Sequence, residues 1–175
     1  MSCPTKRNVV YCKASYDGGD TWNGEQRVFT LDQSALPPNG FAPVPPNCDG
    51  DTNGFYRIGR VWSCVDDNHN VYVCWMDNRY GRYGTTCKDY WHVFCSRSTN
   101  YGADWTTPIQ VSGSTSDPLG SASIGGFMGH DHVPPGDVLT CDADNNRLYA
   151  AWPDSRDSRN EPSYPSQVYF RRIDF

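Results

Sequence analysis

Short apolar runs separated by polar turns recur along the chain and predict β-strands. Such runs include residues 9–12, 71–76, 92–95 and 148–152. The longest uninterrupted run, residues 71–76, is far too short to span a bilayer. Strong helix formers are scarce, with two glutamates and three lysines among 175 residues, whereas Gly (16) and Pro (13) are frequent. These patterns predict an all-β, antiparallel fold.

A first internal repeat relates two segments that lie 83 positions apart. Residues 9–22 align with residues 92–105, and Cys, Ser, Gly and Trp are identical at equivalent positions. Each copy is a short strand followed by a polar turn that ends at Trp22 or Trp105. A repeat of this kind is typical of folds built from recurring supersecondary units.

A second repeat pairs residues 64–79 with residues 141–156, at an offset of 77. Both copies contain a strand, an Asp- and Asn-rich turn, and the pattern Tyr-x-x-Trp-x-Asp-x-Arg. Asp and Asn tolerate the left-handed backbone of tight turns. Each copy is therefore predicted to form a β-hairpin.

The two repeats alternate, which indicates one domain over residues 1–175 built from similar units. We expect a partial unit at residues 8–30, a full four-stranded unit at 55–112 and a second partial unit at 136–175. Residues 34–53, 79–90 and 112–136 interrupt the pattern and are expected to be loops. A unit of about 80 residues, loops included, suits a propeller blade.

The turn at residues 15–22, Ser-Tyr-Asp-Gly-Gly-Asp-Thr-Trp, resembles an Asp box, the repeat of sialidase-like (bacterial neuraminidase repeat) β-propellers. Residues 98–105 resemble a degenerate copy, with Asn100 in the Asp place and Asp104 in the Thr place. The Trp-x-Asp-x-Arg hairpins are similar to those of the same superfamily. The resemblance implies four-stranded antiparallel blades, of which only two to three are encoded here. It also implies structural roles for the box residues Ser15, Asp17, Gly19, Thr21, Trp22, Ser98, Asn100, Gly102 and Trp105.

The family's catalytic set is not recognisable in this chain. Sialidases use three arginines that bind the substrate carboxylate, a Tyr nucleophile paired with a Glu, and an Asp acid/base. Residues 55–59 resemble the family's Arg-Ile-Pro motif, but Gly59 stands in the Pro place. Neither Glu25 nor Glu161 lies in a context that indicates a Tyr partner. No catalytic residue is therefore assigned, and we expect a non-enzymatic protein.

Several polar residues are candidates for ligand contact or metal binding. Asp and Arg two positions apart on a strand share a face, so they can instead form a lateral salt bridge. The Asp-rich turns at 66–70 and 142–146 offer oxygen ligands suited to Ca²⁺, with ordinary turn chemistry as the alternative. His130, Asp131 and His132 form a further polar cluster without identifiable additional ligands. The candidate ligand-binding residues are Arg57, Asp77, Arg79, Tyr80, Asp154 and Arg156.

Eight cysteines without a Cys-x-x-Cys pair indicate disulfides and an oxidising, extracellular compartment. Cys74 can pair with Cys64 across its hairpin or with Cys95 on the next strand. Cys141 aligns with Cys64, yet the repeat offers it no equivalent partner. A bridge between units and a free thiol both remain open for it.

Charge and composition narrow the expected partners. A net charge of −5 gives no broad basic surface, so nucleic acid is not an expected partner. Aromatic residues at Tyr80, Tyr83, Tyr90 and Trp91 suit sugar rings or protein interfaces. We therefore expect a non-catalytic extracellular module that binds a glycan or a protein. A propeller needs more blades than this chain encodes, so other copies or the rest of a longer protein are expected to complete it. The alternative is a fragment of an exo-sialidase-type glycoside hydrolase.

Overall fold

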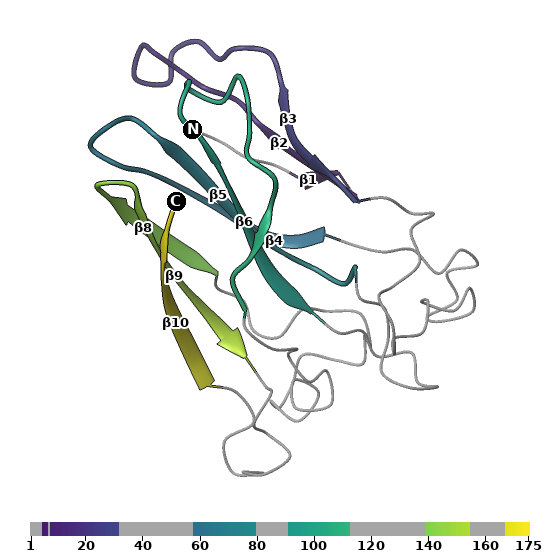
Figure 1. Ribbon diagram of the computed structural model, residues 1–175. Coiled ribbons are helices and arrows are strands. Elements are labelled where there is room, and N and C mark those ends of the chain that lie inside the picture. Colours follow the sequence, from purple (N-terminus) through teal and green to yellow (C-terminus); the bar gives the residue numbers. More distant parts are fainter. Residues whose placement is uncertain (1–4, 7, 32–57, 80–90, 113–138, 155–166) are drawn as a thin grey trace, which may run out of the picture.

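The part of the chain that the structure describes is all-β and antiparallel, with three separate sheets (Figure 1). The computed structural model describes residues 5–6, 8–31, 58–79, 91–112, 139–154 and 167–175. Within these ranges it contains strands and turns and no helix. No helix long and apolar enough to cross a membrane therefore occurs in this part of the chain.

The sheets follow one another along the chain. The N-terminal sheet has the order β1-β2-β3, with β1 Thr5–Lys6, β2 Val9–Cys12 and β3 Gln26–Thr30. The middle sheet has the order β4-β5-β6-β7, with β4 Ile58–Val65, β5 Val71–Asp77, β6 His92–Ser98 and β7 Ile109–Gln110. The C-terminal sheet has the order β10-β9-β8, with β8 Thr140–Asp144, β9 Arg147–Asp154 and β10 Gln167–Asp174. The short strand β1 precedes residue 8, where the first unit was expected to begin.

The middle sheet lies between the other two, and its second strand is buried on both faces (Figure 1). Val71, Val73 and Trp75 point into a core shared with the N-terminal sheet. The alternate residues, beginning with Tyr72 and Cys74, point into a core shared with the C-terminal sheet. Because strand side chains alternate between faces, a continuous apolar run such as that of β5 fits a strand covered on both sides.

A β-bulge near the start of β4 adjusts which side chains enter the first core. The register shifts between Gly59 and Val61, and Arg60 has a positive φ of 49°. Ile58 and Val61 both join the core against the N-terminal sheet, although they are three residues apart. The extra residue of a bulge makes this possible, since regular alternation would place them on opposite faces.

Both predicted hairpins are present, but their turns differ in length. Strands β8 and β9 are joined by Asn145 and Asn146, with φ of 47° and 65°, between the paired residues Asp144 and Arg147. A two-residue turn with both φ positive matches the twist of the flanking strands. The β4–β5 turn is longer, because Val65 pairs with Val71.

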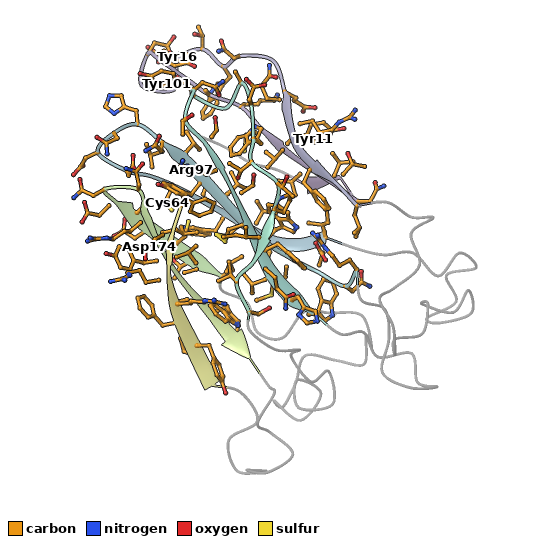
Figure 2. The ribbon with its side chains drawn as sticks, viewed as in Figure 1. Tyr11, Tyr16, Cys64, Arg97, Tyr101 and Asp174 are labelled. Atoms are coloured by element: carbon orange, nitrogen blue, oxygen red, sulfur yellow. A yellow bond between two sulfur atoms is a disulfide. The ribbon has the colours of Figure 1, made fainter. Side chains whose placement is uncertain are left out.

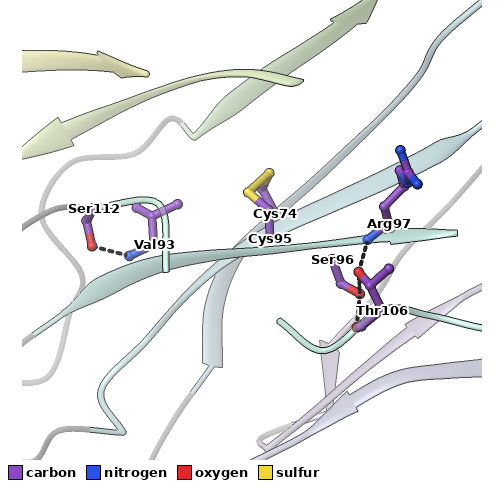
Figure 3. The surroundings of a disulfide bond; sticks show 7 residues. All are labelled: Cys74, Val93, Cys95, Ser96, Arg97, Thr106 and Ser112. Carbon is purple, nitrogen blue, oxygen red and sulfur yellow. Dashed lines mark hydrogen bonds between the residues drawn. A yellow bond between two sulfur atoms is a disulfide. The ribbon is translucent and has the colours of Figure 1, made fainter. Parts of the chain in front are cut away.

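A disulfide joins Cys74 on β5 to Cys95 on β6 (Figure 3). The two residues are direct partners in the sheet, with Cα atoms 4.2 Å apart. This is the second of the two pairings expected for Cys74, and Cys64 is a free thiol. Cys12 also forms a disulfide, whereas Cys141 is free. Stable disulfides are typical of proteins in oxidising compartments.

Candidate functional site

The first box turn connects β2 to β3 and is held by its own side chains. The Asp17 carboxylate accepts hydrogen bonds from the Thr21 amide (2.9 Å), the Thr21 hydroxyl and the Ser15 hydroxyl (2.7 Å). Ser15 Oγ accepts the amide of Gly19 at 2.7 Å, and the Trp22 indole donates to the Gly19 carbonyl at 3.0 Å. Gly19 has a φ of 108°, which explains why glycine stands at this position. The serine and the aspartate thus each accept a backbone amide of the turn.

The second box turn connects β6 to β7 and has the same geometry. Ser98 Oγ accepts the Gly102 amide at 2.8 Å, and Asn100 Oδ1 accepts the Asp104 amide at 2.8 Å. The Trp105 indole donates to the Gly102 carbonyl at 3.0 Å. One side-chain bond runs in the opposite direction. In the first box Thr21 donates to Asp17, whereas in the second Asn100 Nδ2 donates to the Asp104 carboxylate at 2.8 Å. The second box is therefore complete, with donor and acceptor exchanged between two positions.

Two exposed tyrosines, Tyr16 and Tyr101, lie side by side at one rim of the molecule (Figure 2), and a third turn adds His69. Tyr16 of the first box and Tyr101 of the second are 66% and 53% exposed, with ring centroids 6.2 Å apart. His69 of the β4–β5 turn lies 6.1 Å from the Tyr101 ring. We call Tyr16, His69 and Tyr101 the aromatic rim.

The turns that carry the aromatic rim are acidic. Residues 15–22, 66–70 and 98–105 contain five aspartates and no lysine or arginine. Hydrogen bonds from Thr21 and then Ser15 hold the pKa of Asp17 well below its usual value, so this exposed carboxylate is ionised at neutral pH. The rim therefore combines uncharged aromatic faces with fixed negative charge, which disfavours anionic ligands.

Asp77 and Arg79, both candidate ligand residues, form an internal salt bridge. The Asp77 carboxylate is fully buried and accepts from the Trp75 indole at 2.9 Å and from Arg79 Nη2 at 2.6 Å. The Arg79 guanidinium carbon lies 3.5 Å from the centroid of the Phe94 ring and 4.6 Å from that of Phe29. This arginine therefore ties β3, β5 and β6 together through a charge pair and two cation–π contacts.

The remaining sequence candidates fall into two groups. Trp91, expected in an aromatic loop, is buried in the core between the middle and C-terminal sheets, so it presents no surface to a ligand. The other group lies outside the described residues: Arg57, Tyr80, Tyr83, Tyr90, His130, Asp131, His132 and Arg156. The backbone of Asp154 ends β9, but its side chain is also outside the described part of the structure.

The first Asp-rich turn uses its buried carboxylate for hydrogen bonds. Asp66 accepts from the amide and side chain of Asn70, both at 2.8 Å, and from the Tyr72 hydroxyl at 3.0 Å. Burial raises the pKa of Asp66, but hydrogen bonds from Asn70, Asn146 and Tyr72 outweigh it and lower the pKa below 3.8. Burial, and then the Asp66 bond, raise the pKa of Tyr72 to about 12. Among the described residues, no group of three or more His, Cys, Asp or Glu side chains is arranged to hold a metal ion.

The same turn contacts the C-terminal sheet through Asn146. The Asn146 amide donates to Asp66 Oδ2 at 3.2 Å, and its side-chain oxygen accepts from Asn70 at 3.0 Å and from Arg97 at 3.3 Å. Arg97 also donates to the Phe175 carbonyl at 3.4 Å. Sequence reasoning noted the two turns as separate units. The two turns are similar in composition, but composition alone does not indicate that they contact each other.

Comparison with known proteins gives no assignment. No protein-family model matches the chain, and no curated protein matches it significantly. Function is therefore inferred from the box turns, the aromatic rim and the contacts between sheets.

Proposed function

We propose that this chain is a non-catalytic, extracellular Asp-box module that binds a partner at the aromatic rim. The observation that carries this proposal is the exposure of Tyr16, His69 and Tyr101 side by side, each from a different turn. Hydrogen-bonded box turns fix the two tyrosines in position. Rings held in this way lose little conformational freedom when they bind a flat ligand face.

A sialidase-like blade arrangement is the architecture that we propose for the three sheets. They follow one another in sequence and stack face to face through two separate cores. Each box turn lies between the last two strands of its sheet, at equivalent positions in the N-terminal and middle sheets. This equivalence supports reading the sheets as successive blades.

The favoured ligand at the rim is a neutral glycan. Tyrosine faces stack on the apolar faces of sugar rings, and the aspartates of the same turns accept hydrogen bonds from hydroxyl groups. The same aspartates repel a sialic acid carboxylate. A protein segment that carries aromatic or cationic side chains is the alternative occupant.

The test is binding of the full chain to immobilised neutral and sialylated oligosaccharides. We expect binding to neutral glycans, and a loss of at least about tenfold in affinity for the Tyr16→Ala/Tyr101→Ala variant, as for aromatic residues at the centre of an interface. Trp62→Ala removes an exposed aromatic of β4 and is the matched control. Binding that survives the double substitution, or that occurs only with sialylated glycans, would contradict the proposed site.

The alternative function, part of a glycoside hydrolase, is tested separately. Hydrolysis of a fluorogenic sialoside by the chain, lost in Arg57→Ala, would overturn the non-catalytic proposal. No turnover by the complete natural polypeptide would support it.

Assembly with further copies, or with the rest of a longer protein, is the second part of the proposal. The face of the C-terminal sheet that points away from the core carries Tyr149, Val168 and Phe170. Val168 is 79% exposed and Phe170 is 65% exposed. Another blade packed on this face would cover these side chains, as the C-terminal sheet covers the middle one.

A further inference from the structure

Two free cysteines from different sheets meet in the core between the middle and C-terminal sheets. Cys64 lies on β4 and is partly exposed, whereas Cys141 lies on β8 and is buried. Cys141 belongs to the buried apolar cluster of this core, Cys64 packs against that cluster, and the strands β4 and β8 that carry them lie in contact. Cys64 is seen beside the C-terminal sheet in Figure 2.

The register of the two hairpins explains why the thiols face each other. Cys64 pairs with Tyr72, which points toward the C-terminal sheet. Cys141 pairs with Ala150, which points back toward the middle sheet. Residues that are paired directly across antiparallel strands share a face, so each cysteine follows its partner into the same core.

We propose that Cys64 and Cys141 form a redox-dependent disulfide site that links the middle and C-terminal sheets covalently. This inference rests on the contact between the sheets and is independent of ligand binding at the aromatic rim. The bond would join two segments that β-sheet hydrogen bonding does not connect, since β4 and β8 belong to different sheets.

The reaction requires an oxidant, for which a small disulfide such as oxidised glutathione suffices. The Cys64 thiolate attacks one sulfur of that disulfide, forms a mixed disulfide and releases one small thiol. Cys141 loses its proton and attacks Cys64 Sγ, which forms the protein disulfide and releases the second small thiol. The protein loses two electrons and two protons, and the oxidant is reduced to two thiols.

The order of these steps follows from the surroundings of the two cysteines. The hydrogen bond with Cys64, and then burial, raise the pKa of Cys141, which keeps this thiol protonated at neutral pH. Cys64 is the member that solvent reaches, so the oxidant reacts there first. Cys74 does not compete, because it is already bonded to Cys95.

The test is disulfide mapping of the full chain before and after equilibration with reduced and oxidised glutathione. Free thiols are alkylated, and the peptides are identified by mass spectrometry without reduction. We expect a linked pair containing Cys64 and Cys141 after oxidation, and a Tm higher by roughly 5–10 °C than that of the alkylatable form. Two thiols that stay alkylatable after oxidation, or a bond from Cys64 to another cysteine, would overturn the proposal.

A matched variant tests whether the bond forms only when the thiol points toward the C-terminal sheet. In Ser63→Cys/Cys64→Ala the thiol moves by one residue, so it points toward the N-terminal sheet. We expect no bond to Cys141 in this variant, whereas formation of that bond would show that facing does not control the reaction. Mapping of the unaltered chain decides the proposal even if this variant fails to fold.

Discussion

At the scale of single residues, Asp66 joins two sheets through one carboxylate. It accepts hydrogen bonds from its own turn, from Tyr72 on β5 and from the Asn146 amide of the neighbouring hairpin. A buried carboxylate satisfied in this way stabilises the fold only while it is ionised, because the hydrogen bonds favour the charged form.

The pKa of Asp66 predicts an acid-sensitive contact. Its folded pKa is lowered below 3.8, so its contribution to stability is present above that pH and is lost as the pH falls through the folded pKa. We expect Asp66→Asn to lower the free energy of unfolding by about 1–3 kcal/mol at neutral pH. The difference from the unaltered chain should shrink in acid, which denaturant unfolding across pH measures.

Asp67→Asn is the control for this prediction, since Asp67 is an exposed carboxylate in the same turn. It should leave the free energy of unfolding almost unchanged at neutral pH. Parallel stability curves for Asp66→Asn and the unaltered chain down to about pH 2 would contradict a role for Asp66 ionisation.

At the scale of elements, the β8–β9 turn has two asparagines with similar backbone conformations and different side-chain contacts. Both have positive φ, and among the described residues the Asn146 side chain, not that of Asn145, bonds the middle sheet, at Asn70 and Arg97. Glycine adopts the same backbone at either position. The turn therefore allows backbone and side-chain contributions to be separated.

We predict that Asn146→Gly destabilises the protein by about 1–2 kcal/mol more than Asn145→Gly, because it removes two hydrogen bonds between sheets. Chemical denaturation of the two variants at neutral pH gives the difference. Equal free energies of unfolding would mean that the Asn146 side chain contributes nothing to the contact.

The sequence predicted the strands and hairpins well, because each depends on local alternation and turn residues. It left the partner of Cys74 open, since Cys64 and Cys95 both flank β5. It aligned Cys141 with Cys64, whereas the strand register makes Cys141 equivalent to Ser63. Between equivalent paired residues, the connection from Ala143 to Leu148 is one residue shorter than that from Val65 to Val71. One residue is enough to move a side chain to the other face.

The candidate site was predictable only in part. The box residues were found because their hydrogen bonds lie within eight consecutive positions. The aromatic rim was missed because Tyr16, His69 and Tyr101 come from three turns, and their proximity depends on how two sheets pack. The same holds for the contact between Asp66 and Asn146, which are 80 positions apart.

At the scale of the whole molecule, the three described sheets form an open stack and do not close into a ring. The middle sheet is covered on both faces, whereas the C-terminal sheet leaves Val168 and Phe170 exposed on its outer face. Apolar side chains gathered on an exposed sheet face mark a surface for association.

We predict that the native mass of the chain exceeds 19.7 kDa at micromolar concentration, and that Phe170→Lys shifts it toward the monomer. Light scattering after size exclusion measures this shift. Val65→Lys replaces a half-exposed apolar residue on β4 and should leave the mass unchanged. A monomeric unaltered chain would contradict self-association and leave the rest of a longer protein as the expected partner.

The exchanged donor and acceptor of the two box turns also constrain how such sequences can diverge. The first box holds Asp17 with Thr21, and the second holds Asn100 with Asp104. A chain that replaced Asn100 by Asp before it replaced Asp104 would set two carboxylates against each other. An intermediate with Asn and Thr keeps a donor and an acceptor at every step. A duplicated box can therefore change from the Asp and Thr pair to the Asn and Asp pair if Asp is replaced by Asn first. It cannot do so if Thr is replaced by Asp first, because two carboxylates then face each other.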